Sequence, residues 1–326
     1  MKTKMKSHRR VSIILAGGKS ERLFPLKSPK PLLKVNGKSL LLQTLDRVSG
    51  TKRFILTNSK LVPIFRKELR QPQYRDVRFL IEPAARDTAP AIAFALYKLK
   101  KFKPDTVTIL SADHYIPSTA RFIRTIGTVM RELEKFPDNI FLMGISARSQ
   151  AKNDYGQFGW ILPAKDKQKS LKVRGFIEKP KGDKINKLVK EGGLINAGIF
   201  FGRYSTFCEA FERHYAPGFL KKFKFEALTR ISIDHAVISK WKNLRVVPYQ
   251  DSWNDVGTWP ALKKMGLGSA YQEAESENCS VFGNPSSQVF LIGVKDLVVV
   301  WDEDRLMICA QDKIHSLKSW LPKLKK

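Results

Sequence analysis

The stretch VSIILAGGKSERLFPLKSPK, which runs from Val11 to Lys30, decides the fold. Its first six residues form an apolar run that is short enough for one buried strand. Gly17 and Gly18 follow at once, and glycines at the end of a parallel strand let backbone N–H groups approach an anion because no Cβ intervenes. Arg22 and Lys30 add positive charge to the same segment. The stretch therefore predicts a polyphosphate site.

The glycine spacing excludes two common phosphate-binding motifs. The sequence has no G-x-x-x-x-G-K-[ST] here, so the loop is not a P-loop. It also has no G-x-G-x-x-G, which excludes the dinucleotide fingerprint. A strand followed by two glycines is also typical of a simple tight turn, and the charges of Arg22 and Lys30 favour the phosphate interpretation.

Short apolar runs alternate with amphipathic runs after this stretch. Strands are predicted at Arg53–Thr57, Val77–Glu82, Thr106–Leu110 and Ile140–Ser146. Helices are predicted at Ser39–Val48, Leu61–Arg70, Thr88–Lys101, Ser118–Phe136 and Arg203–Arg230. This alternation predicts an α/β fold, a mostly parallel sheet flanked by helices, with ligands beyond the carboxyl ends of its strands.

Composition narrows the class of protein. Of the 326 residues, 43% are hydrophobic, which supports a sizeable core. No apolar run approaches the roughly 20 residues that span a bilayer, and the basic start MKTKMKSHRR precedes a run too short for a signal peptide. The three cysteines, Cys208, Cys279 and Cys309, lie far apart, as expected of free thiols in a reducing compartment. We therefore expect a cytoplasmic location and no membrane partner.

The formal net charge of +29 raises the question of nucleic-acid binding. The basic residues are spread along the chain, with modest clusters at Lys2–Arg10, Lys221–Lys224 and Lys323–Lys326. No RNA-binding aromatic motif or recognition helix accompanies them. A generally basic surface is favoured over a dedicated nucleic-acid site.

Residues 15–23, LAGGKSERL, followed by Pro29-Lys30, resemble the signature of the sugar-phosphate nucleotidyltransferases. The resemblance implies a Rossmann-like fold of the nucleotide-diphospho-sugar transferase type. It also implies that Ala16, Gly17 and Gly18 wrap the nucleotide, and that Arg22 and Lys30 are catalytic because they neutralise its phosphates. Ser20 departs from the family, which usually has a third glycine here.

The loop after the third predicted strand, EPAARDTAPAI from Glu82 to Ile92, reads by itself as a helix start with free N–H donors. It resembles the E-P-x-x-R-N-T-A-P-A-I segment of mannose-1-phosphate guanylyltransferases. That resemblance implies nucleotide contacts from five residues: Glu82, Arg86, Asp87, Thr88 and Ala89. Asp87 replaces the usual asparagine, and a carboxylate accepts from guanine N1–H or N2–H but cannot donate to O6.

Two aspartates are candidate metal ligands. Asp113 lies in SADH, just after the fourth predicted strand, where its carboxylate suits either Mg²⁺ or the capping of a helix. The stretch resembles the family's P-A-D-H, which implies the metal role. Asp255 lies in Trp253–Trp259, which resembles W-x-D-V-G-[ST]-W and implies a second ligand of the same Mg²⁺.

Three further resemblances concern residues that would bind the sugar 1-phosphate. Tyr155 and Gly156 match a turn that begins the family's sugar pocket. Glu178 and Lys179 end a predicted strand, Val173–Pro180, and F-x-E-K-P implies that the glutamate contacts the sugar and the lysine its phosphate. The stretch NAGIF, from Asn196 to Phe200, resembles the family's N-[SA]-G-[IM]-[FY]. This resemblance implies hydrogen bonds from Asn196 to sugar hydroxyls. Asp234, in SIDHAVI, either caps a helix or touches the sugar side.

The pattern of apolar and polar residues changes near Gly266. Short β-rich runs at Val289–Leu291, Leu297–Trp301 and Leu306–Ile308 precede a predicted basic helix at His315–Leu324. The division we predict is a basic tail at 1–10, a nucleotidyltransferase domain at 11–265 and a small β-rich domain at 266–326. The last resembles the truncated β-helical tail of short guanylyltransferases, which lack an isomerase domain, so isomerase activity is not predicted.

The reaction that the resemblance implies joins GTP and mannose 1-phosphate into GDP-mannose and diphosphate. Another sugar 1-phosphate or another nucleoside triphosphate is the open enzymatic alternative. A catalytically inactive nucleotide-binding or nucleic-acid-binding protein is the alternative of another class. A homodimer is compatible with the sequence.

Overall fold

The computed structural model describes residues 9–18, 23–147, 152–165, 168–269, 271–283 and 288–324. The chain divides into two compact units. The first comprises Met1–Gly17, Leu41–Ala112 and Ile116–Trp253, and the second comprises Gly18–Leu40, Asp113–Tyr115 and Asn254–Lys326. The second unit therefore combines two short early segments with the C-terminal part of the chain. The predicted division into consecutive domains, with a boundary at residue 265, stays a prediction.

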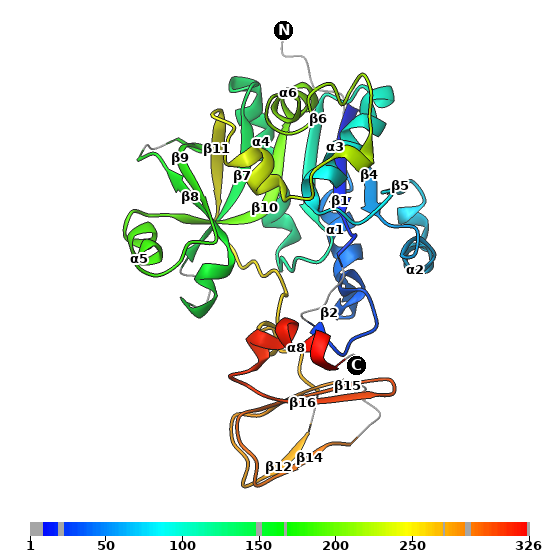
Figure 1. Cartoon of the computed structure of the whole chain (residues 1–326), viewed down its shortest axis with the longest axis vertical. Helices are drawn as coiled ribbons and strands as arrows, with labels where there is room; N and C mark the ends of the chain where they lie inside the picture. Colours follow the sequence, from blue (N-terminus) through cyan, green and yellow to red (C-terminus); the bar gives the residue numbers. More distant parts are fainter. Residues whose placement is uncertain are drawn as a thin grey trace. The chain divides into compact units, whose positions relative to one another are not determined.

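The first unit is built on a nine-stranded sheet (Figure 1). In spatial order its strands are β5 (Arg78–Ile81), β4 (Lys52–Thr57), β1 (Arg10–Leu15), β6 (Thr106–Ser111), β10 (Leu194–Arg203), β7 (Ile140–Ser146), β11 (Leu244–Tyr249), β9 (Leu171–Glu178) and β8 (Gly159–Pro163).

Strand direction divides this sheet into two parts. β5, β4, β1 and β6 run parallel to one another, as the alternation of strands and helices predicts. β10 lies antiparallel between β6 and β7, and β9 pairs antiparallel with both β11 and β8. The α/β fold class is confirmed, and the sheet becomes mixed beyond β6.

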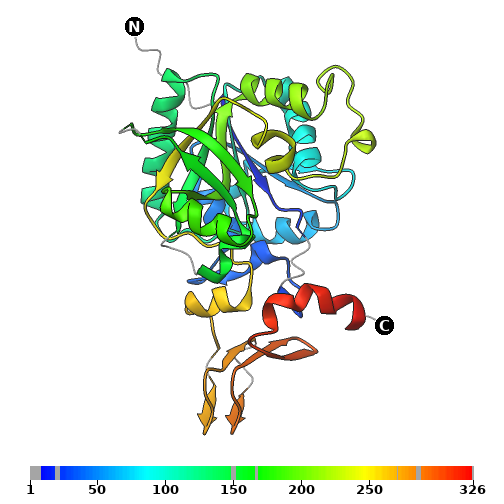
Figure 2. The same cartoon turned by 60° about the vertical axis from the view of Figure 1, so that its left-hand side comes forward.

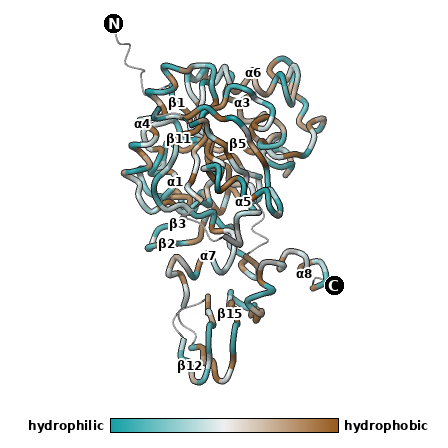
Figure 3. Tube along the Cα trace, turned by 90° about the vertical axis from the view of Figure 1, so that its left-hand side faces the viewer, coloured by the Kyte–Doolittle hydropathy of each residue, from teal (hydrophilic) through white to brown (hydrophobic). Residues whose placement is uncertain are grey.

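The strands form where the apolar runs lie. In β1, Val11, Ile13 and Ile14 are at most 2% exposed, because a strand covered on both faces buries successive residues. Hydrophobic segments colour the interior of this unit brown in Figure 3. Burial of these side chains is the main force that holds the sheet to its helices.

Helices cover both faces of the sheet (Figure 2). The helices of the first unit are α1 (Leu40–Arg47), α2 (Val62–Glu68), α3 (Thr88–Leu99), α4 (Thr119–Lys135), α5 (Asp183–Lys190) and α6 (Tyr204–His214). α3, α6 and a π-helical turn at Asp234–Ile238 share one core cluster with Val246 of β11. Tyr249, which alternation places on the opposite face of β11, packs against Phe122 of α4.

The predicted helix Arg203–Arg230 is wrong beyond His214. α6 ends there, and Gly218, which follows Pro217, adopts a positive φ of 74° that does not continue a helix. Phe219 and Phe225 are each 3% exposed and join the core of the first unit, so burial of aromatic rings shapes this segment rather than a helical period.

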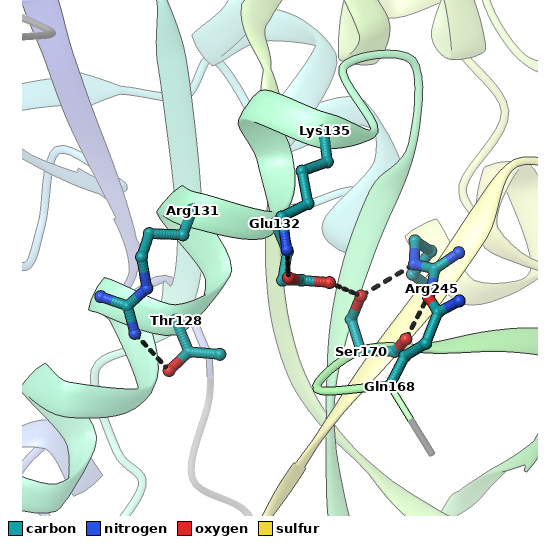
Figure 4. A network of polar contacts seen from close by, with 7 residues as sticks. All are labelled: Thr128, Arg131, Glu132, Lys135, Gln168, Ser170 and Arg245. Atoms are coloured by element: carbon teal, nitrogen blue, oxygen red, sulfur yellow. Dashed lines mark hydrogen bonds and ion pairs between the residues drawn. The ribbon is translucent and has the colours of Figure 1, made fainter. Parts of the chain in front are cut away.

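A polar network joins α4 to β11 and to the residues before β9 (Figure 4). The Glu132 carboxylate of α4 accepts from Lys135 Nζ at 2.8 Å and from the Ser170 hydroxyl at 2.6 Å. Arg245 of β11 donates to the same hydroxyl at 2.8 Å and to Gln168 Oε1 at 2.7 Å. Burial acts to raise the pKa of Glu132, but the two hydrogen bonds and nearby cations hold it below its usual value. The network ties α4 and β11 to the start of β9.

The second unit carries the β-rich part, as predicted. Its elements are β2 (Lys34–Val35), β3 (Lys38–Ser39), α7 (Trp259–Lys264), β12 (Gln272–Ala274), β13 (Ser280–Phe282), β14 (Phe290–Ile292), β15 (Leu297–Asp302), β16 (Arg305–Ala310) and α8 (Leu317–Leu324). Its core brings Leu23 and Val35 together with Trp259, Phe282 and Val300. The segment from Leu23 to Val35 is therefore packed against the C-terminal strands.

An acidic turn between β15 and β16 holds this loop directly. The Lys27 backbone N–H donates to Asp302 Oδ2 at 2.7 Å. The Lys27 ammonium lies 2.7 Å from Glu303 Oε2 and 2.6 Å from Asp304 Oδ1. We call these contacts of Lys27 the acidic clasp. None of the helices in the described ranges has the length and apolar character needed to cross a bilayer.

Candidate active site

Three of the predicted motifs follow the carboxyl ends of the parallel strands β1, β5 and β6. The backbone N–H groups of Ala16, Glu82 and Ala112 each bond to the neighbouring strand, one residue beyond the ends of β1, β5 and β6. Parallel strands place these ends at one edge of the sheet, where ligands bind in open α/β sheets. The N–H of Ala16 is used by this ladder, and the residue is 3% exposed.

Gly17 and Glu82 form a close backbone-to-carboxylate contact. A Cβ at Gly17 would lie 2.5 Å from Glu82 Oε1, so any other residue here would displace this carboxyl group from its present position. Glu82 is 7% exposed, and burial raises its pKa to about 7. Gly18, in contrast, has open space where its Cβ would stand. The site thus contains a buried carboxyl group that changes charge near neutral pH.

Arg86 and Asp87 hold the start of α3. The Arg86 guanidinium donates to the backbone carbonyls of Glu226 at 2.8 Å and of Leu228 at 3.0 Å. Asp87 has a φ of 75° and caps α3, with its Oδ1 accepting from the Thr88 N–H at 2.7 Å. Aspartate and asparagine both cap helices, so Asp87 retains a capping role that asparagine would also serve. Its φ of 75° with a ψ of −179° lies in a region that is otherwise occupied almost only by glycine, so this backbone conformation is strained.

The N–H donors at the start of α3 are not free, in contrast to the prediction. Thr88 N–H bonds to Asp87, and Ala89 N–H donates to the Ile231 carbonyl at 3.1 Å. The Thr88 hydroxyl accepts from the Ile233 N–H at 2.8 Å. The prediction overlooked the Ile231 carbonyl and the Ile233 N–H because these residues lie far from Thr88 in the sequence. Side chains rather than these N–H groups must carry any contact to a nucleotide.

Lys30, Asp113 and Asp255 come together in the second unit. The Lys30 ammonium lies 2.7 Å from Asp113 Oδ2, and it also donates to the backbone carbonyl of Asp255. The Lys30 side chain is only 8% exposed and that of Asp113 is 26% exposed. Three residues that the sequence analysis selected separately are therefore joined by direct contacts.

An isolated pair of backbone bonds brings the two aspartates into this arrangement. Tyr115 N–H donates to the Asn254 carbonyl at 2.9 Å, and Asn254 N–H donates back at 3.0 Å. Val256, next to Asp255, has a φ of 49°, which is a strained conformation for a β-branched residue. Strain of this kind is found where surrounding structure holds a functional site in shape.

The donor chemistry of Asp113 and Asp255 fits Mg²⁺. Both supply carboxylate oxygens, the ligands that this hard cation prefers. Asp255 Oδ1 is oriented by the Gly257 N–H at 3.2 Å. Within the described ranges no three His, Cys, Asp or Glu residues gather into a metal cage. A magnesium ion held by two carboxylates takes its remaining ligands from water and from substrate phosphates.

Glu178 and Lys179 lie at the end of β9 in the first unit. A Cβ at Gly159 of β8 would stand 2.5 Å from Glu178 Oε2 and 3.0 Å from the Phe176 ring, so Gly159 makes room for the carboxylate. Lys179 has a φ of 46°, and its ammonium lies 3.5 Å from Glu178 Oε1. The Lys179 side chain is 64% exposed, which leaves it able to meet an anion.

Asn196 and Asp234 share a hydrogen bond in the first unit. Asn196 is 9% exposed, and its Nδ2 donates to Asp234 Oδ1 at 2.9 Å. Burial raises the pKa of Asp234 to about 7, and the Glu178 carboxylate acts in the same direction. Glu178, Asn196 and Asp234 therefore form one polar region, of which the sequence analysis left Asp234 undecided.

Tyr155 and Gly156 take packing positions. Tyr155 is 7% exposed, its hydroxyl donates to the Ala147 carbonyl at 2.8 Å, and its ring packs edge-on against Trp160. A Cβ at Gly156 would lie 3.4 Å from the Pro180 carbonyl oxygen. Arg22, the other predicted catalytic residue, lies outside the described residues.

Gly159 lies next to a candidate site residue, and the sequence analysis gave it no role. It is the first residue of the stretch GWI, which follows Tyr155 and Gly156 closely in the sequence. Only the placement of Glu178 opposite it explains why a glycine stands there. Asp234 was noticed without its partner, since the bond to Asn196 joins segments 38 positions apart.

Comparison with known proteins gives two family matches. Residues 11–270 match the family described as Nucleotidyl transferase, and residues 273–324 match the MannoseP isomerase/GMP-like beta-helix domain. The alginate biosynthesis protein AlgA of Pseudomonas aeruginosa is 30% identical over 94% of this chain and 70% of its own. A mannose-1-phosphate guanylyltransferase of Escherichia coli K12 is 27% identical over 96% of this chain and 73% of its own.

One solved structure shows the same architecture. The mannose-1-phosphate geranyltransferase from Thermus thermophilus superposes with a TM-score of 0.84 and 25% identity, over 98% of this chain and 100% of the other.

Proposed function

Because the chain belongs to the nucleotidyl transferase family, we propose that it converts GTP and mannose 1-phosphate into GDP-mannose and diphosphate. The broader activity rests on the family itself: the chain is a nucleotidyltransferase that acts on a sugar phosphate. The relatives named as mannose-1-phosphate guanylyltransferases support the choice of sugar and nucleotide.

The observation that carries the proposal is the contact set of Lys30. Its ammonium meets the Asp113 carboxylate and the Asp255 carbonyl, in a position where the lysine is largely shielded from solvent. A preorganised cation in such a place needs no rearrangement of solvent when charge develops on a phosphate. Lys30 would therefore stabilise the nucleotide phosphates during the reaction, and Arg22 would add a second positive charge.

The chemistry requires no general base. An oxygen of the sugar phosphate is already ionised near neutral pH and would attack the α-phosphorus in line, while diphosphate leaves. Two anions must approach each other, so the barrier is lowered by positioning and by fixed positive charge. The exposed ammonium of Lys179 would hold the attacking phosphate, with Glu178 and Asn196 bound to sugar hydroxyls.

Members of this family act with a divalent metal ion, and we propose Mg²⁺ held by Asp113 and Asp255. When bound, the ion would neutralise negative charge on the nucleotide phosphates. Asp113 would then be shared between the metal and Lys30. The ion pair of Lys30 with Asp113 keeps that carboxylate and that ammonium together before substrate arrives.

Choice of the base is the finer part of the proposal. Ionised Glu82 would accept hydrogen bonds from guanine N1–H and N2–H, an arrangement that adenine cannot reproduce because it has no N1–H donor. Asp87 is less suited to that task, since its Oδ1 already caps α3. A buried acceptor that is left without a donor is costly, which is how such a site rejects the wrong base.

The test is diphosphate release from purified protein with Mg²⁺, mannose 1-phosphate and each of GTP, ATP, UTP, CTP and dTTP in turn. We expect release with GTP alone. Release with another triphosphate, or only with another sugar 1-phosphate, would overturn the choice of substrate. Salt-sensitive binding of DNA or RNA without any turnover would favour the inactive binding protein instead.

A further inference from the structure

The Asn196 amide is held at both ends. Asn196 lies in β10 where the pairing with β7 shifts between Asn196 and Phe200. Its Oδ1 accepts from the Gly198 N–H at 3.1 Å, and its Nδ2 donates to Asp234 Oδ1 at 2.9 Å. An amide bonded at both ends cannot flip, so the N–H and lone pair that remain point in fixed directions. A hydroxyl-bearing ligand would meet one defined pattern of donor and acceptor.

Asp234, which fixes the amide nitrogen, begins a rigid element. It is the first residue of the π-helical turn Asp234–Ile238, in which Ala236, Val237 and Ile238 are at most 1% exposed. π-Helical turns are rare and are frequently found at functional sites. Because the turn is anchored in the core, the backbone of Asp234 is held in place by this packing.

The segment that leads into Asp234 is bonded to the predicted nucleotide loop. Ile233 N–H donates to the Thr88 hydroxyl at 2.8 Å, and Ile231 O accepts from the Ala89 N–H at 3.1 Å. Thr88 and Ala89 form the first turn of α3. The hydrogen bonds of Ile231 and Ile233, the backbone that continues from Ile233 to Asp234, and the bond from Asp234 to Asn196 thus connect the start of α3 with Asn196.

We propose that Asp234 is a positioning residue that orients Asn196 for the sugar and links this orientation to the start of α3 through Thr88. The inference rests on the proposed role of Asn196 in sugar binding. It assigns Asp234 no contact with the reacting atoms. Its role is to select, through Asn196, which hydroxyl arrangement the sugar site accepts.

The first experiment compares Asp234→Ala with Asp234→Asn. Alanine removes the acceptor, and we expect KM for the sugar 1-phosphate to rise on the order of tenfold, the usual effect of leaving one buried donor unpaired. KM for the triphosphate should change less than the sugar KM. Asparagine keeps an oxygen for the Asn196 amide, so it should restore most of the sugar affinity. Equal effects of both substitutions on both KM values would overturn the proposal.

A double-mutant cycle with Asn196→Ala tests whether Asp234 acts through Asn196. In the Asn196→Ala background, Asp234→Ala should add little further loss in sugar KM, whereas independent residues would give additive losses. Additive losses would overturn the positioning role. If Asp234→Ala does not fold, Asp234→Ser replaces it in the cycle. The serine hydroxyl keeps a polar group at this position but ends one bond closer to the backbone than the aspartate carboxylate.

Thr88→Val tests the link to α3, because valine keeps the shape but removes the acceptor of the Ile233 N–H. We expect the sugar KM to rise severalfold in Thr88→Val, and a rise confined to the triphosphate KM would overturn the link. Wild-type turnover on a panel of sugar 1-phosphates distinguishes failure of the proposed function from failure of the positioning role of Asp234. A wild type without turnover refutes the proposed function, whereas an active wild type with additive variants refutes only this inference.

Discussion

The ammonium of Lys30 lies 2.7 Å from the carboxylate of Asp113, and the lysine of this pair is only 8% exposed. Such a shielded lysine would present its charge without the screening that weakens surface ion pairs. The same carboxylate is a proposed metal ligand. Loss of either partner is therefore expected to affect catalysis.

Lys30→Ala is expected to lower turnover on the order of 10²–10³-fold, the usual loss when one preorganised charge-stabilising group is removed. KM for both substrates should change much less, since the lysine is needed mainly as charge moves onto diphosphate. Steady-state kinetics of the purified variant measures this. Lys34→Ala, an exposed lysine in β2, is the matched control and should stay near wild type. An unchanged turnover number in Lys30→Ala would remove the lysine from the mechanism.

Asp113→Asn and Asp255→Asn are expected to raise the Mg²⁺ concentration needed for half-maximal activity. Each substitution removes one of the two negative charges that fit the metal. Activity is measured against a Mg²⁺ titration, and EDTA should abolish it. Asp105→Asn serves as the control, because Asp105 is paired with Arg9 and belongs to no predicted motif. Full activity in EDTA would contradict the metal assignment.

Glu82→Gln is expected to change the pH dependence of both stability and nucleotide affinity. Burial raises the pKa of Glu82 from 4.5 to about 7, so the neutral form is favoured in the folded protein. Its stabilising contribution is present at acidic pH and is lost as pH rises through about 7. The wild type should therefore lose up to about 3 kcal/mol relative to Glu82→Gln between pH 5 and pH 8.

The nucleotide affinity should change in the opposite direction. Only ionised Glu82 accepts two N–H donors of guanine, so KM for GTP should rise as pH falls from 8 to 6 in the wild type. The Glu82→Gln variant should lack this titration. Denaturant unfolding and GTP kinetics across this pH range measure the two effects. Parallel pH profiles for wild type and variant would show that Glu82 does not titrate near 7.

Gly159→Ala is expected to raise KM for the sugar 1-phosphate severalfold. The new Cβ would lie 2.5 Å from Glu178 Oε2, so the carboxylate must move from its position. Gly175→Ala is the control on the adjacent strand β9, where the nearest atom to a new Cβ is a Leu162 methyl carbon at an ordinary 3.5 Å. Sugar-phosphate kinetics should separate the two variants, and equal KM values would show that Gly159 does not control Glu178.

The parts of the fold that could be predicted are those with a local signal. The β1 run and the strand Ile140–Ser146 follow from apolar residues bounded by turns. The segment after His214 could not be predicted in this way. There Phe219 and Phe225 are drawn into a core made by distant elements, and this overrides helical propensity.

The candidate site shows the same limit. Sequence reasoning selected Lys30, Asp113 and Asp255 separately, and the bridge between Tyr115 and Asn254 explains how distant segments bring two of them together. The reasoning also expected free N–H donors at Thr88 and Ala89, which the structure satisfies internally. Residue types predict which chemistry is present, but partners far away in the sequence decide which groups remain available.

The acidic clasp has a consequence for the newly made chain. Lys27 is held by residues that follow it by 275 to 277 positions. At about 5–20 residues per second, a ribosome needs on the order of tens of seconds to make that much chain. Lys30, Asp113 and Asp255 have all been synthesised before Asp302 appears. A nascent chain that stops short of the β15–β16 turn thus contains these three residues but still lacks the anchor of the loop that carries the first of them.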